Sequence, residues 1–152
     1  MTILVDTGIF YALLDKADVN HLNSKAILTH SLEGRFGRVY TIDYVVLETT
    51  TLLRVRMKPE TALAFTKFLD KSGIQVISID LETYRKALDL FKKMYNKLSL
   101  TDAALITVLR EWNLEYLATF DERSFSSLVK NTIGRGYFDS LPIEEKKRLK
   151  HL

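Results

Sequence analysis

The chain has 152 residues, a length at which one domain buries roughly 70% of the surface that its unfolded form exposes. It contains no cysteine, so structural disulfides, thiolate metal sites and cysteine nucleophiles are excluded. The hydrophobic fraction of 47% and the charged fraction of 27% are ordinary for a globular protein, and the net charge of +3 permits nucleic-acid binding without requiring it.

Short apolar runs alternate with longer stretches of helical spacing along most of the chain. In chain order, the pattern predicts a strand at 2–5, helices at 8–14 and 20–34, a strand at 39–42, helices at 43–56 and 59–71, a strand at 74–79, helices at 80–95 and 99–112, and a strand at 115–120. Asp18 or Asn20 would cap the second helix. Asp43 and Asp80 would cap two later helices, and Gly73 would end the fourth.

The pattern weakens beyond residue 125. Gly134 and Gly136 mark a turn, and Pro142 begins a short helix whose charge run at 144–150 is expected to be solvated rather than a dedicated binding arm. Strands that alternate with helices predict βαβ units. We therefore expect an α/β fold, a three-layer α/β/α sandwich with a mostly parallel central sheet, formed by one domain over residues 1–152.

Nothing in the sequence suggests a membrane or an export route. No apolar run approaches the ~20 residues that span a bilayer. The N-terminus lacks a basic segment followed by an apolar stretch, so we expect no signal peptide and a cytoplasmic location.

Four acidic residues stand alone where the chain otherwise turns apolar: Asp6, Glu48, Asp102 and Asp121. Asp6 and Asp121 directly follow predicted strands, and the carboxyl ends of parallel strands lie at one edge of a sheet. Glu48 and Asp102 lie on apolar helix faces, and Asp102 is in the first turn of its helix. All four can thus meet at one end of the sheet. A divalent cation bound there would keep carboxylates beside buried surface ionised.

Each acid taken alone also has a structural interpretation. Either strand-end aspartate could cap a loop or a helix, and Asp102 fits a capping box with Ser99. Glu48 is the hardest to explain in this way, because no basic residue lies three or four positions from it. Taken together, two strand-end acids and two acids on apolar helix faces favour a shared site.

Four segments carry a family resemblance. They are V-D-T at 5–7, D-Y-V-V-L-E-T-T-T-L-L-R at 43–54, L-S-L-T-D-A-A-L-I-T-V-L-R-E at 98–111 and L-A-T-F-D-E-R-S-F at 117–125. In this order they resemble the PIN-domain family, and in particular the VapC toxins of toxin–antitoxin pairs. The resemblance spans residues 2–125 and leaves 128–152 as a C-terminal extension without a family motif.

The resemblance implies a Mg²⁺- or Mn²⁺-dependent nuclease, usually a ribonuclease, that forms a homodimer when of the VapC type. The residues that match the family's metal-binding acids are Asp6, Glu48, Asp102 and Asp121. Thr7 and Thr119 match the small polar residues beside them. Asn96 and Lys97 stand where many relatives carry an extra acid, which leaves open whether one or two ions bind.

We expect the four acids to have different roles in binding the ion. Asp6 and Asp102 would be the main direct ligands, because Mg²⁺ takes only a few carboxylates directly and keeps several waters. Glu48 would act through water or orient the attacking water, and Asp121 would complete the site or hold a second ion. The two threonines would bind ligand waters or substrate phosphate, or else satisfy turn backbone.

RNA affinity would come from phosphate contacts by basic side chains. The candidates are Arg35, Arg38, Arg54, Arg56, Lys92, Lys93, Arg123 and Arg135. Phe10, Tyr11 and Tyr44 could stack on bases. We expect these three aromatic residues mainly in the core or at a dimer interface.

The sequence therefore predicts a divalent-metal-dependent endoribonuclease, the toxin of a pair that a cognate antitoxin protein neutralises. Two alternatives remain: a housekeeping PIN nuclease that processes RNA, and a non-catalytic PIN-fold interaction module. The four intact acids argue against the second. A receiver-like Mg²⁺-binding signalling domain would need paired acids after the first strand, and Asp6 has no acidic neighbour.

Overall fold

The computed structural model describes residues 1–152 and contains a five-stranded, all-parallel sheet in the order β3-β2-β1-β4-β5. The strands are β1 (Thr2–Val5), β2 (Arg38–Ile42), β3 (Gln75–Ile77), β4 (Tyr116–Ala118) and β5 (Thr132–Ile133). The helices are α1 (Thr7–Leu14), α2 (His21–Leu32), α3 (Asp43–Arg56), α4 (Pro59–Ser72), α5 (Leu81–Met94), α6 (Leu100–Glu111), α7 (Glu122–Phe125) and α8 (Ile143–Lys150). The predicted α/β class is confirmed.

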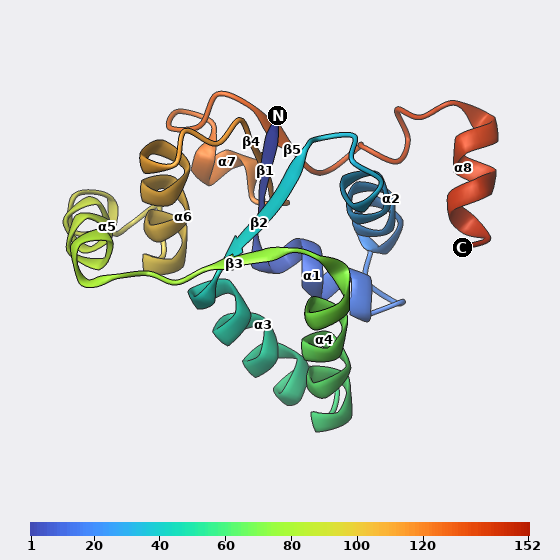
Figure 1. Cartoon of the computed structure of the whole chain (residues 1–152), viewed down its shortest axis with the longest axis horizontal. Helices are drawn as coiled ribbons and strands as arrows, with labels where there is room; N and C mark the ends of the chain where they lie inside the picture. The colour runs from blue at the N-terminus through green and yellow to red at the C-terminus, as the bar shows by residue number, and fades with distance from the viewer.

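Helices cover both faces of the sheet, as Figure 1 shows. α5 and α6 pack together on one side, while α1 and α2 lie on the other. α3 and α4 form a pair below the carboxyl ends of β1 and β2 in this view, and α8 packs against α2. These layers form the predicted α/β/α sandwich. No helix in the structure combines the length and apolar character that a membrane crossing requires.

The buried parts of the central strands β1 and β4 are apolar because helices cover both of their faces. Ile3, Leu4 and Val5 of β1 are fully buried, as are Leu117 and Ala118 of β4. These strands end at the same edge of the sheet, and the chain becomes polar as it leaves each of them. A rigid apolar layer thus positions the residues that follow β1 and β4.

Local signals set most helix boundaries. Asp80 caps α5 by accepting the backbone N–H of Thr83 at 2.8 Å, and Gly73 ends α4 with a left-handed φ of 79°. The prediction for Asp43 is wrong, because it is the first residue of α3 rather than its cap. Its carboxylate instead accepts the N–H of Ile79 at 3.1 Å, which ties α3 to the chain after β3.

The sequence pattern did not reveal β5 or α7. β5 has only two residues, and it pairs with Leu117 and Ala118 of β4. A strand this short has no room for a period-two pattern, so its pairing depends on the return of the chain to the sheet edge.

Candidate active site

A cavity of about 440 Å³ lies at the carboxyl ends of the strands, and all four predicted acids line it. Asp6 follows β1 and Asp121 follows β4, whereas Glu48 comes from α3 and Asp102 from the first turn of α6. The acids are therefore brought together from four separate elements. A fifth acid on the wall, Asp18, comes from the loop between α1 and α2.

Asp6 is the most buried of these acids, and its position is fixed from several sides. Its backbone N–H donates to the carbonyl of Ala118 on β4 at 3.0 Å. Its Oδ1 accepts the N–H of Thr7 at 2.7 Å, which caps α1, and its Oδ2 accepts the hydroxyl of Thr119 at 2.8 Å. The carboxylate therefore has a single defined orientation at the junction of two central strands.

The carboxylates repel one another across the cavity. Burial raises the pKa of Asp6 to about 7. The negative charges of Asp102 and Glu48 also act to raise it, whereas the hydrogen bonds from Thr119 and Thr7 act to lower it. Burial also raises the pKa of Asp102, with further contributions from Asp121 and Glu48. A cation in the cavity would relieve both effects, because it favours the ionised form of every acid around it.

Hydroxyl and backbone groups hold the helical acids. Asp102 forms the predicted capping box with Ser99: its Oδ2 accepts the Ser99 N–H at 2.9 Å, and its own N–H donates to the Ser99 hydroxyl at 3.0 Å. Asp102 still lines the cavity, so the capping role and a ligand role are compatible. Glu48 accepts the hydroxyl of Thr101 at 3.0 Å and has no basic partner.

The two predicted threonines differ in their contacts. The Thr119 hydroxyl donates to Asp6 and accepts the N–H of Asp121 at 3.1 Å, so it connects the two strand-end acids from behind the cavity. The side chain of Asp121 accepts the hydroxyl of Ser124 at 2.7 Å. Thr7 lines the cavity, and its buried hydroxyl has no hydrogen-bond partner. A buried hydroxyl without a partner is unfavourable unless a ligand completes it.

The donor set fits a hard divalent cation. The wall offers carboxylate and hydroxyl oxygens, with no thiol and no imidazole, as Mg²⁺ and Mn²⁺ prefer. No group of three acidic or histidine side chains is close enough to form a ready-made cage. Mg²⁺ retains several waters and takes few carboxylates directly, so a ring of separated carboxylates suits a hydrated ion.

Two of the eight basic candidates line the cavity, Arg56 and Arg135. The Arg56 guanidinium lies over the Tyr11 ring, 5.6 Å from its centroid, and the Tyr11 hydroxyl donates to Asp15 at 3.0 Å. Phe10 is fully buried against Phe65, which confirms the core interpretation for that residue.

Sequence reasoning assigned Asp18 and Asn20 only to helix capping, yet both line the cavity. The Asp18 side chain accepts the N–H of Asn20 at 2.8 Å, and Asn20 makes no side-chain cap to α2. Thr101 and Ser124 were missed as partners of the acids. The signal for both was their position: each is a hydroxyl residue in the first turn of a helix that begins at the cavity.

Known proteins resemble this chain over nearly its whole length. The model of the PIN domain family matches residues 3–131. A VapC ribonuclease of Archaeoglobus fulgidus is 38% identical over 151 residues, which covers 98% of this chain and 93% of that protein.

Solved structures share the fold. Mycobacterium tuberculosis VapC20, described as a sarcin-ricin loop cleaving toxin, superposes with a TM-score of 0.71 at 23% identity and covers 82% of this chain and 94% of its own. VapBC2 from Rickettsia felis, solved with a DNA fragment from its promoter, gives a TM-score of 0.63 at 14% identity and covers 89% of this chain and 98% of its own.

The chain therefore belongs to the PIN-domain family. Within that family its relatives are the VapC ribonucleases, since the Archaeoglobus protein matches it almost from end to end.

Proposed function

We propose that this protein is a divalent-metal-dependent endoribonuclease that hydrolyses RNA phosphodiester bonds. The observation that carries the proposal is the cavity lined by Asp6, Glu48, Asp102 and Asp121, none of which forms an ion pair. Uncompensated carboxylates around one cavity call for a bound cation. The 38% identity to a VapC ribonuclease supports RNA as the substrate.

In this proposal, Asp6 and Asp102 hold Mg²⁺ or Mn²⁺ directly, Glu48 acts through water and Asp121 completes the site. A bound ion of this kind lowers the pKa of a coordinated water and neutralises charge on phosphoryl oxygens. The protein's own contribution is orientation. Hydroxyls such as that of Thr119 hold the carboxylates in place, as outer partners do in metal sites.

Two further side chains suit an anionic substrate. The unpaired Thr7 hydroxyl is available to donate to a phosphate oxygen or to a ligand water. Arg56, held over Tyr11, adds positive charge to a wall that carries five acids, which favours an anionic phosphodiester.

Single-turnover RNA cleavage with Mn²⁺ tests the enzymatic proposal. The wild type is compared with Asp6→Asn, with Asp139→Asn as a matched control at an exposed position, and with wild type in EDTA. We expect cleavage only by the wild type and the control with metal present. Equal background activity in the wild type and Asp6→Asn would refute the nuclease proposal and favour a non-catalytic interaction module.

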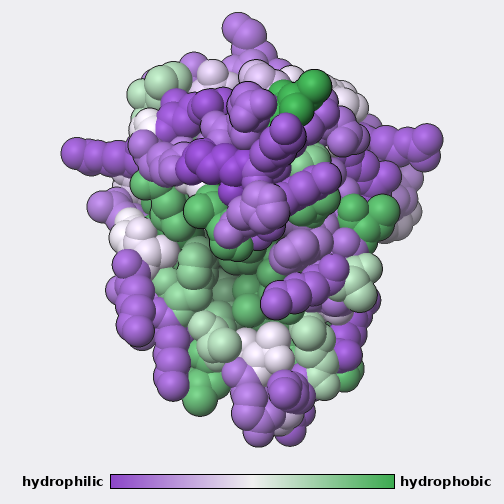
Figure 2. Space-filling view, turned by 90° about the vertical axis from the view of Figure 1, so that its right-hand side faces the viewer, coloured by the Kyte–Doolittle hydropathy of each residue, from purple (hydrophilic) through white to green (hydrophobic).

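We also propose that the protein is the toxin of a toxin–antitoxin pair and binds a cognate antitoxin protein. Its VapC relatives support this, as do large apolar side chains exposed on α3 and α4, namely Leu47, Val55 and Leu63. Figure 2 shows the face formed by α2, α4 and α8. On this face, a hollow between hydrophilic side chains exposes apolar surface.

Expression in cells separates the toxin from a housekeeping RNA-processing nuclease. A toxin stops growth when expressed alone, and co-expression of the product of a small adjacent gene relieves the arrest. Absence of growth arrest, with RNA cleavage intact, would favour RNA processing. We further propose a homodimer, which light scattering coupled to size-exclusion chromatography measures directly.

A further inference from the structure

The chain after β5 lies beyond the family match, yet it reaches the acidic cavity. The N–H of Thr119 donates to the carbonyl of Ile133 at 2.9 Å, and the N–H of Arg135 donates to the carboxylate of Glu122 at 3.0 Å. These two bonds hold the start of the C-terminal segment against the β4–α7 turn. Arg135 is thereby placed beside the turn that carries Asp121.

Gly134 makes this close approach possible. A Cβ at that position would lie 2.0 Å from the carbonyl oxygen of Thr119 and 2.6 Å from Oε1 of Glu122. Only glycine leaves room for the backbone to lie directly on the turn. This backbone contact therefore fixes the position of the next residue, Arg135, as a free surface loop would not.

The Arg135 side chain is exposed, and its guanidinium forms no hydrogen bond or ion pair. It lines both the acidic cavity and an adjoining hollow of about 460 Å³, which Phe120, Asp121, Glu122 and Arg123 also line. An arginine without a carboxylate partner at the boundary of two hollows remains available to an anion.

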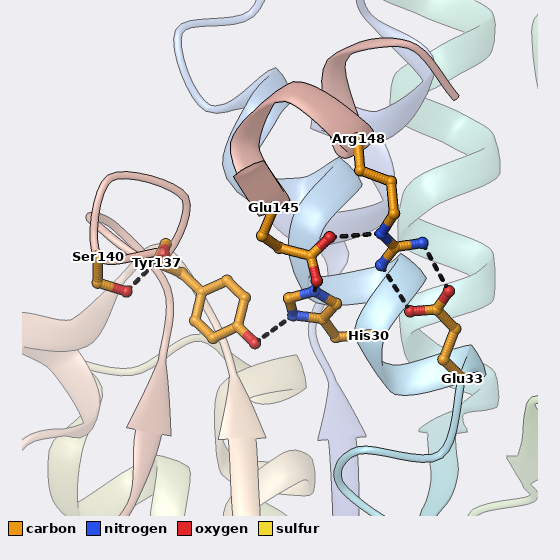
Figure 3. Close-up of polar contacts among 6 residues, drawn as sticks. All are labelled: His30, Glu33, Tyr137, Ser140, Glu145 and Arg148. Atoms are coloured by element: carbon orange, nitrogen blue, oxygen red, sulfur yellow. Dashed lines mark hydrogen bonds and ion pairs between the residues drawn. The ribbon is translucent and has the colours of Figure 1, made fainter. Parts of the chain in front are cut away.

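The rest of the segment is anchored on α2, as Figure 3 shows. The side chains of Tyr137 and His30 share a hydrogen bond of 2.6 Å between the hydroxyl and Nδ1, and Glu145 lies 3.3 Å from the histidine Nε2. Arg148 donates to Glu145 and makes two parallel 2.9 Å bonds to Glu33. Arg135 thus lies between two attached regions, so its backbone is already ordered before an anion binds and only its side chain loses freedom on binding.

We propose that Arg135 is a substrate-binding residue that holds the phosphate next to the scissile phosphodiester, so that the RNA strand leaves the acidic cavity through the adjoining hollow. This inference rests on the proposed ribonuclease function. The planar guanidinium matches a phosphate with two parallel hydrogen bonds. Phe120 lines both hollows and offers a surface on which the neighbouring base stacks.

The test measures binding apart from cleavage. A short fluorescein-labelled single-stranded RNA is titrated by fluorescence anisotropy with the Asp6→Asn protein, alone or with Arg135→Ala, Arg135→Lys or Arg110→Ala added. Arg110 is exposed in the last turn of α6, at the opposite end of that helix from Asp102, so it controls for net charge. Titrations run between about 50 and 200 mM salt, where counterion release determines the slope.

We expect Arg135→Ala to weaken binding about ten-fold or more, as the loss of charge-assisted hydrogen bonds does. Its plot of log affinity against log salt should be shallower by about 0.7, one phosphate contact on a single strand. Arg135→Lys should restore the slope but only part of the affinity, and Arg110→Ala should match its parent. In the cleaving protein, Arg135→Ala should raise KM more than it lowers kcat.

Two results overturn the inference while leaving the enzyme proposal intact: an unchanged affinity and slope in Arg135→Ala, or an equal loss in Arg110→Ala. A wild type that neither binds nor cleaves RNA contradicts the proposed function itself and the inference with it. Thermal unfolding of each variant checks the fold. The Arg135 side chain makes no intramolecular bond, so its removal should leave the melting temperature unchanged.

Discussion

Replacing Asp6 with asparagine is expected to stabilise the metal-free protein at alkaline pH while abolishing its activity. The side chain is 8% exposed, and burial raises its pKa from 3.8 to about 7. At 1.36 kcal/mol per pKa unit, keeping Asp6 ionised in the folded state above pH 7 costs about 4 kcal/mol. Asparagine retains the shape and can still accept the N–H of Thr7, but it carries no charge.

The pH dependence has a defined sign. The unfolded chain ionises Asp6 near pH 4 and the folded chain near pH 7, so in this window the folded state binds more protons. The contribution of Asp6 to stability therefore falls as pH rises from about 4 to 7 and stays low above that. The advantage of Asp6→Asn should reach about 4 kcal/mol near pH 8 and vanish near pH 4.

Thermal unfolding in EDTA at several pH values measures the difference. For a chain of this size, about 4 kcal/mol corresponds to roughly 8–16 °C in Tm. Asp139→Asn, at an exposed position, is the control and should not shift Tm. In scans without EDTA, Mg²⁺ at about 100 times its Kd should add about 2.7 kcal/mol to the wild type and to Asp139→Asn, but not to Asp6→Asn. The electrostatic reasoning would be refuted if Asp6→Asn were less stable than the wild type near pH 8. It would also be refuted if the Tm of the variant differed from that of the wild type by the same amount near pH 4 and near pH 8.

Three other changes test the packing of the C-terminal segment. Gly134→Ala should destabilise by about 1–3 kcal/mol, because its methyl group overlaps the Thr119 carbonyl, and should reduce RNA affinity together with stability. Leu149→Ala should cost about 2–5 kcal/mol, since this side chain is fully buried against Ala26 and Phe138. His30→Gln should lessen the loss of stability on acidification. Burial lowers the pKa of His30 in the folded state, so as the pH falls the unfolded chain binds this proton before the folded chain does, and unfolding is favoured.

Urea denaturation measures all three changes in unfolding free energy. The His30 comparison is made in an Asp6→Asn background, so that the opposing titration of Asp6 is absent, and it compares the loss of stability between about pH 7 and 5. Val19→Ala, at a fully solvated position, is the control for Leu149→Ala. A Gly134→Ala protein of unchanged stability would show that the C-terminal segment does not need its close approach to the turn after β4. If His30→Gln lost as much stability between about pH 7 and 5 as its parent, the role of His30 burial would be contradicted.

Much of the architecture followed from local patterns in the sequence. Apolar runs that end in a lone carboxylate located β1 and β4, and capping residues such as Ser99 and Asp80 fixed helix starts within a few positions. These features can be predicted from the sequence because strand burial and helix capping depend on residues close together in the chain. The same local placement put the four acids at one end of the sheet, while their role as metal ligands stays a prediction.

Tertiary structure decided which groups meet those acids. Thr119 contacts Asp6 from 113 positions away, and Arg148 contacts Glu33 from 115 positions away, so neither pair leaves a periodic signal in the sequence. β5 exists only because the chain returns to the edge of β4, and that return carries Arg135 to the cavity wall. Periodicity encodes which face of an element is buried, but it does not encode which distant side chain packs against that face.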